Sequence, residues 1–200
     1  NRLTKFPIFS LRDIRKAIPV FSYRQLDRWE KKGYLAKLKQ GYYSFANQDK
    51  DQKFLFYTAN RIYSPSYLSL ETAMKYYGFI PEEIFQITSI STKKTTIFNS
   101  FVGSFSYRHL TPALFFGYQF LDFGRQRLLM AEPEKAILDY LYLNPKFKKT
   151  EDFLGMRINV GEFYLKINFE KFNKYLEAFQ NKALQKRTKI FLETLKNDNS

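Results

Sequence analysis

The segment SLRDIRKAIPVFSYRQLDRWEKKG, residues 10–33, constrains the fold most strongly, because it contains two helix patterns separated by a turn of about four residues. Ser10 precedes the first helix pattern and Ser22 precedes the second, and serine is a favoured residue at the start of a helix. Pro19 ends the first pattern, and Gly33 ends the second. Two short helices joined in this way predict a helix-turn-helix.

The second helix pattern is apolar on one narrow face, at Leu26 and Trp29, and mainly basic on the other, which also carries Asp27. Its basic side chains are Arg24, Arg28, Lys31 and Lys32. The sequence YLAKLKQGYYSF that follows predicts a hairpin of two strands. The turn of this hairpin carries Lys37, Lys39 and Gln40. Such a hairpin is typical of the wing of a winged helix, whose basic tip can contact phosphate or the minor groove of DNA.

Positive charge is concentrated at the same end of the chain. The 200 residues carry a net charge of +14. Residues 1–45 contain 11 basic and 3 acidic side chains, net +8, whereas the remainder contains 22 and 16, net +6. A concentrated basic patch favours nucleic acid as the partner. The alternatives are a small helical subdomain with solvated charged faces and a winged helix that docks a protein.

The rest of the chain predicts a second domain of helices and strands. The polar segment NQDKDQ predicts a linker between a winged helix-turn-helix at residues 1–46 and an α/β domain at residues 53–200. Helix patterns occur in SLETAMKYYG and EPEKAILDYLYL, and strand patterns in FQITSIS, TTIFNSF, SFSYRHL, YQFLDF and QRLLMA. The tail from Asn168 to Lys196 predicts basic helices with a break near Asn181. We therefore expect an α+β fold with a helical tail.

Few residues suit catalysis or metal binding. The absence of cysteine excludes disulfides, thiolate zinc sites and cysteine nucleophiles. The single histidine, His109, is expected to make a polar contact with a neighbouring loop rather than to act as a base. Glu132, Glu134 and Asp139 are candidate paired carboxylates, but the start of a helix favours Glu132 and Glu134 as partners of the helix dipole. We expect no catalytic residue, no metal and no cofactor.

Composition limits the class of protein and the cellular location that we expect. Aliphatic and aromatic residues make up 44% of the chain, which is enough to form a core. No apolar run approaches the roughly 18 residues of a membrane-spanning helix. No signal peptide is visible either, so a cytoplasmic protein without a membrane partner is expected.

Four segments carry a resemblance to a known family. They are QLDRWEKKGYLAKLKQGYYSF, SPSYLSLETAMKYYGFIPE, SYRHLTPALFFGY and MAEPEKAILDYLYL. The chain from residue 10 to about 143 resembles the AbiEi-type antitoxins of bacterial abortive-infection toxin–antitoxin systems, which couple an N-terminal winged helix to an α/β domain. One departure is that a winged helix ordinarily has a further helix before FSLRDI, where this sequence offers NRLTKFPI.

Because a lone winged helix reads only a few base pairs, we expect two protomers on an inverted repeat. The resemblance implies a repressor that binds double-stranded DNA at its own promoter. It implies a DNA-binding role for Tyr23, Arg24, Arg28, Lys31, Lys32, Lys37, Lys39 and Gln40. It also implies that residues 53–200 counteract a nucleotidyltransferase-like toxin without a stable complex. The candidate antitoxin surface is the basic tail, at Lys182, Lys186, Arg187 and Lys189, for which a solvated helix face is the alternative.

Two other functions stay open. One is a transcription factor of the winged-helix class whose C-terminal domain senses a ligand or dimerises. The other is a nucleic-acid-processing enzyme that uses the carboxylates named above. A toxin gene beside this one would favour the antitoxin over the plain transcription factor, and metal-dependent cleavage of DNA or RNA would favour the enzyme.

Overall fold

A computed structural model of the chain describes residues 6–123 and 126–198. Its N-terminal elements are β1 (Ile8–Ser10), α1 (Leu11–Ala17), α2 (Tyr23–Lys31), β2 (Leu35–Lys39) and β3 (Tyr42–Phe45). The two helices begin where the sequence predicts, because Ser10 and Ser22 each form a complete capping box with the residue three positions on. Gly33 follows α2 with a φ of 70°, a left-handed conformation that glycine adopts without strain.

The strands of this N-terminal unit form a three-stranded antiparallel sheet in the order β1-β3-β2. The hairpin β2–β3 was predicted, and β1 was not. A small core lies between the sheet and the helices, and its buried members are Phe9, Ile14, Leu26, Leu35 and Tyr43. Trp29 packs against this core, as the apolar face of the second helix pattern predicted.

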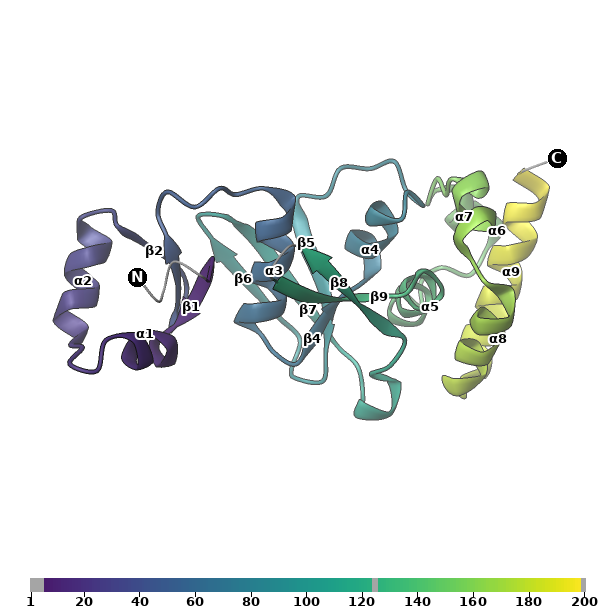
Figure 1. Cartoon of the computed structure of the whole chain (residues 1–200). Coiled ribbons are helices and arrows are strands. Elements are labelled where there is room, and N and C mark those ends of the chain that lie inside the picture. The colour runs from purple at the N-terminus through teal and green to yellow at the C-terminus, as the bar shows by residue number, and fades with distance from the viewer. Residues whose placement is uncertain (1–5, 124–125, 199–200) are drawn as a thin grey trace.

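The middle of the molecule is a six-stranded sheet in the order β6-β7-β5-β4-β9-β8 (Figure 1). Its strands are β4 (Ser66–Leu68), β5 (Gln86–Ser91), β6 (Thr96–Ser100), β7 (Gly103–His109), β8 (Tyr118–Phe123) and β9 (Gln126–Ala131). The pairs β5–β7 and β4–β9 are parallel, and the other pairs are antiparallel. The predicted hairpin of YQFLDF and QRLLMA is confirmed, although its turn at 124–125 lies outside the described residues.

Helices pack against this sheet and extend the molecule away from the N-terminal unit (Figure 1). They are α3 (Gln52–Ile62), α4 (Leu70–Tyr76), α5 (Pro133–Leu143), α6 (Thr150–Leu154), α7 (Val160–Lys166), α8 (Phe169–Ala178) and α9 (Lys182–Asp198), with a 3₁₀ turn at Pro112–Leu114. The break between α8 and α9 confirms the one predicted near Asn181. Among the described residues, no helix is both long and apolar enough to span a membrane. The fold is mixed α+β, as expected.

The N-terminal sheet packs directly against the larger sheet. Strand β2 contacts β6, and the buried residues Ile8 and Leu38 belong to the main hydrophobic core rather than to the small one. An ion pair of 3.1 Å between Asp13 and Arg61 joins α1 to α3 across the same junction. Helix α3 begins at Gln52, the last residue of the predicted linker. The two parts therefore share a packed boundary.

Candidate nucleic-acid interface

Helix α2 forms the outer end of the molecule, on the side away from the large sheet (Figure 1). Its buried residue is Leu26, so the opposite face is solvated. Four exposed cations lie on that face and just beyond its end: Arg24, Arg28, Lys31 and Lys32. Within the described residues, these four side chains take part in no ion pair or hydrogen bond. We call them the basic face of α2.

Tyr23 begins α2 and extends the same surface, since its side chain is 55% exposed. Its hydroxyl accepts a hydrogen bond of 2.8 Å from Nη2 of Arg15, and the Arg15 guanidinium also lies 5.5 Å from the centroid of the Tyr23 ring. The contact links α1 to the start of α2. It holds a fifth cation, Arg15, beside the basic face of α2.

Two of the three side chains of the hairpin β2–β3 that were predicted to contact DNA are exposed to solvent. Lys37 and Gln40 are exposed. Lys39 was predicted to point outward, and that orientation is wrong. Its Nζ donates a hydrogen bond of 3.0 Å to the carbonyl of Ile62 and lies 4.0 Å from the ring centroid of Phe98. Burial, and then the nearby charge of Lys93, lowers the pKa of the Lys39 ammonium.

One of the four residues predicted to form the exposed surface of the basic tail is buried. Lys182, Lys186 and Lys189 are exposed on α9. Arg187 is only 9% exposed, and its guanidinium donates to the carbonyls of Phe147 and Leu141, each at 2.9 Å. Burial lowers the pKa of Arg187, and the two carbonyls accept from its Nε and Nη1. Arg187 therefore ties α9 to α5 and does not belong to an exposed surface.

His109 lies at the exposed end of β7. Its Nδ1 is 3.1 Å from the carbonyl oxygen of Lys93, and its backbone N–H donates to Oγ1 of Thr95 at 3.1 Å. This is the polar contact with a neighbouring loop that the sequence analysis expected. Among the described residues, no group of three or more histidine or acidic side chains is placed to hold a metal ion.

The three candidate carboxylates have separate structural partners. Glu132 accepts from the Tyr175 hydroxyl at 2.5 Å and from Nζ of Lys171 at 3.3 Å. One oxygen of Glu134 accepts from the backbone of Asn168 at 2.8 Å, and the other is buried without a hydrogen bond among the described residues. Both glutamates thus connect α5 to α8, whereas the sequence analysis explained them by the helix dipole alone.

Asp139 belongs to a buried polar network that the sequence analysis missed. It pairs with Lys135 one turn earlier on α5, and both side chains are fully buried. The hydroxyls of Tyr67 and Ser69 each donate to Asp139 at 2.9 Å, and Lys135 also donates to the Tyr67 hydroxyl. The spacing of four residues between a lysine and an aspartate was the visible signal, but the same spacing is common on solvated helices.

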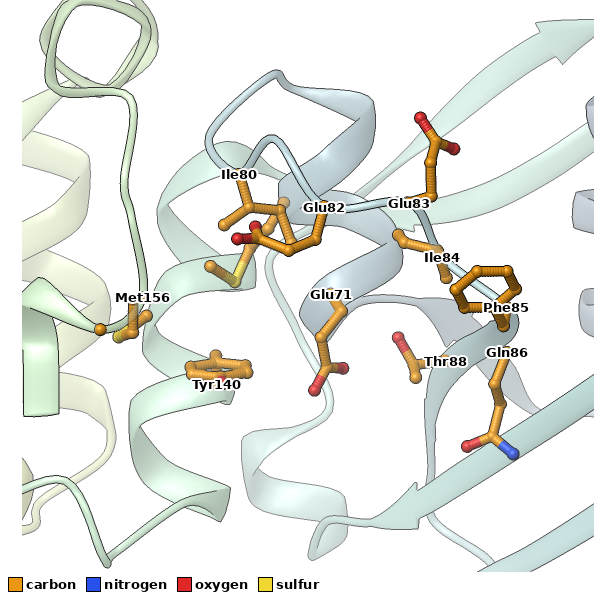
Figure 2. A pocket seen from close by; sticks show the side chains of 12 residues that line it. Glu71, Ile80, Glu82, Glu83, Ile84, Phe85, Gln86, Thr88, Tyr140 and Met156 are labelled. Carbon is orange, nitrogen blue, oxygen red and sulfur yellow. The ribbon is translucent and has the colours of Figure 1, made fainter.

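A cavity of about 460 Å³ lies where α4, α5 and the segment 80–86 meet, beside strand β5 (Figure 2). Its wall residues are Glu71, Met74, Ile80, Glu82, Glu83, Ile84, Phe85, Gln86, Thr88, Tyr140, Gly155 and Met156. Burial raises the pKa of the Tyr140 hydroxyl to about 12, with further contributions from the charges of Glu71 and Glu82. The tyrosine is therefore a neutral hydroxyl in the cavity wall. The sequence offered no motif for this site.

The chain matches no protein-family model and no curated protein.

Proposed function

We propose that this protein is a DNA-binding regulator that contacts duplex DNA through α2. The observation that carries the proposal is the basic face of α2, four exposed cations without protein partners at one end of the molecule (Figure 1). Phosphate is the anion that such a row recognises, and arginine also reads guanine edges in the major groove. The opposite side of α2 is held by Leu26 and Trp29, so the basic face can approach DNA without unfolding the unit.

The N-terminal unit is proposed to act as a winged helix. In this assignment α1 and α2 form the helix-turn-helix, and β2–β3 is the wing. Lys37 and Gln40 are the exposed side chains of the wing that reach the flanking backbone. Lys39 is assigned to the junction with the large sheet instead. Strand β1 lies directly before α1, where a winged helix ordinarily has a further helix.

The proposed biological role is that of the AbiEi-type antitoxins that the sequence resembles. The protein would repress its own promoter and counteract a nucleotidyltransferase-like toxin without a stable complex. The exposed lysines of α9 (Lys182, Lys186 and Lys189) are the proposed antitoxin surface, since they extend a basic patch far from α2. His109 and the carboxylates of α5 make hydrogen bonds within the protein, and this supports a role without catalysis.

The test is binding to the DNA upstream of the protein's own gene. Arg24→Ala combined with Arg28→Ala should weaken specific binding, because each lost base-edge contact costs about 1–3 kcal/mol. The matched control replaces two exposed lysines of the C-terminal helices, Lys174→Ala with Lys186→Ala, and should bind as the wild type does. Equal affinity for the α2 double variant and the control would exclude α2 as the reading helix.

A second candidate function is a transcription factor whose C-terminal region senses a ligand. The cavity at α4 and α5 is the specific observation that favours it, because its volume lies within the range of small-molecule sites. The two candidates share the DNA-binding unit and differ in what the large sheet and its helices do. Growth rescue from a toxin supports the first, and ligand-dependent operator binding supports the second.

A further inference from the structure

The cavity between α4 and α5 has walls of mixed chemistry. Met74, Ile80, Ile84 and Met156 make much of the surface apolar. Phe85 stands at the rim with 93% of its side chain exposed, an unusual exposure for a phenylalanine. An apolar lining with a few convergent polar groups is typical of a site for a small organic molecule.

The carboxylates of the cavity differ in how they are compensated. Glu83 pairs with Lys75 at 3.1 Å, and Glu82 lies 3.7 Å from Arg157. Glu71 is half-buried and has no ion pair or hydrogen bond within the described residues. The chain has a net charge of +14, yet the negative Glu71 carboxylate has no basic side chain paired with it among the described residues.

The Tyr140 hydroxyl is the second polar group without a partner. Figure 2 shows the Glu71 side chain extending from α4 into the space between Tyr140 and Thr88. The hydroxyl of Tyr140 has no hydrogen bond within the described residues, whereas Oγ1 of Thr88 is already bonded to Ser69 and Thr72. One carboxylate and one neutral hydroxyl therefore line the same half-open cavity.

We infer that this cavity binds a small organic cation, an ammonium group on an apolar body. The ammonium would pair with Glu71 and donate to the Tyr140 hydroxyl, and the body would lie against the methionine and isoleucine side chains and Phe85. A ligand ammonium would supply the counter-charge and the charge-assisted hydrogen bond that the Glu71 carboxylate lacks among the described residues. One carboxylate and one hydroxyl suit a monovalent ammonium better than a divalent metal, which takes six or more oxygen ligands.

The inference rests on the cavity of the second candidate function and not on DNA binding. The probes are three small molecules with the same phenylethyl body: 2-phenylethylamine, which is a cation, 2-phenylethanol, which is neutral, and 3-phenylpropionate, which is an anion. Calorimetric titration of the full chain without DNA should show binding of the amine alone or at least about tenfold more tightly than of the alcohol, the factor that one charge-assisted hydrogen bond supplies. Equal binding of all three probes, or none by the amine, overturns the inference.

Substitutions locate the site and keep the test independent of folding. Glu71→Gln preserves shape and should remove the preference for the amine, and Tyr140→Phe should reduce amine affinity several-fold. Glu177→Gln, at an exposed carboxylate of α8 outside the cavity, should leave binding unchanged. Amine binding that survives Glu71→Gln places the cation elsewhere and overturns the assignment. Binding of an arginine-rich peptide with no binding of the amine identifies a protein side chain as the occupant and also overturns it.

Discussion

Lys135 and Asp139 form an ion pair one turn apart on α5, and both side chains are completely buried. The ammonium lies near three aromatic rings, and its centroid distances are 4.9 Å to Phe179 and 5.0 Å to Phe116. Burial lowers the pKa of Lys135, and burial raises that of Asp139, while the pairing opposes both shifts. The network holds the centre of the C-terminal region rather than an accessible site.

Breaking this pair should therefore be a stability change. Lys135→Met keeps the stem volume and removes the ammonium, which leaves the buried Asp139 charge with hydroxyl donors alone. The free energy of unfolding should fall by about 3–5 kcal/mol in urea titrations. Lys174→Met, at an exposed site on α8, is the control and should stay within about 0.5 kcal/mol of the wild type. Similar stability of the two variants would show that Asp139 is neutral in the folded protein.

The ends of the helices could be predicted because their causes are local. Ser10 and Ser22 each bond to a backbone N–H three residues away, so a short window of sequence contains both partners. Strand β1 has three residues, and its partner β3 lies more than thirty positions later, so no local pattern revealed it. The break before α9 was predicted because Asn181 caps the helix through the N–H of Leu184.

The orientation of long basic side chains could not be predicted in the same way. Lys39 and Arg187 were expected in solvent because of their charge. They donate instead to the carbonyls of Ile62, Leu141 and Phe147, which are at least 23 residues away in the sequence. The cavity was missed for the same reason, because Glu71 and Tyr140 meet only in the folded chain. A count of charges therefore located the basic end of the chain but not the exposed members of each patch.

The stability that Asp13 contributes at the junction between α1 and α3 should depend on pH. Partial burial raises the pKa of its carboxyl, but hydrogen bonds from Ser10 and the charge of Arg61 outweigh this effect, so the pKa lies below its ordinary value of 3.8. A depressed carboxyl pKa contributes stability that is present above the unfolded value and is lost as pH falls through the folded value. Asp13→Asn should thus cost about 0.5–1 kcal/mol at neutral pH, because the ion pair is partly solvated.

The measurement is the urea midpoint of unfolding from neutral pH to about pH 2. The difference between the wild type and Asp13→Asn should shrink as the pH falls below the ordinary carboxyl value. Arg61→Leu removes one source of the shift and should give an intermediate profile. A difference that stays constant across this range would contradict the assignment to the Asp13 charge.

Lys37 and Lys39 are two positions apart on β2, and their substitutions should have different effects. Lys37→Ala should flatten the dependence of log K on log salt by roughly 0.9, the value for one lost phosphate contact. Lys39→Ala should leave that slope unchanged and lower thermal stability, because its ammonium bonds to Ile62 in the protein. DNA titrations at several salt concentrations, with melting curves of both variants, make the comparison. A flattened slope for Lys39→Ala would instead indicate that Lys39 contacts DNA phosphate.

Operator binding should involve two protomers on an inverted repeat. The basic face of α2 offers four cations, which suffice for a few base pairs, and a two-fold site doubles the information that is read. Footprinting should show two half-sites whose centres are separated by one or more turns of DNA, about 10 base pairs each. One short protected patch with one protein per DNA would contradict this arrangement.

Toxin neutralisation should depend on the C-terminal region and should need no chemistry by this chain. The intact 200-residue chain is the right material, because Ile8 and Leu38 are part of the main core and removal of the N-terminal unit would expose it. Growth rescue in cells that express the cognate toxin should survive Arg24→Ala with Arg28→Ala, and also His109→Ala, because the His109 ring makes a structural contact with the loop carbonyl of Lys93. Changing Lys182, Lys186 and Lys189 to Glu reverses the charge of the proposed surface and should abolish rescue. Loss of rescue in a folded His109→Ala protein would instead indicate catalysis, and loss in the α2 variant would show that DNA binding is needed for neutralisation.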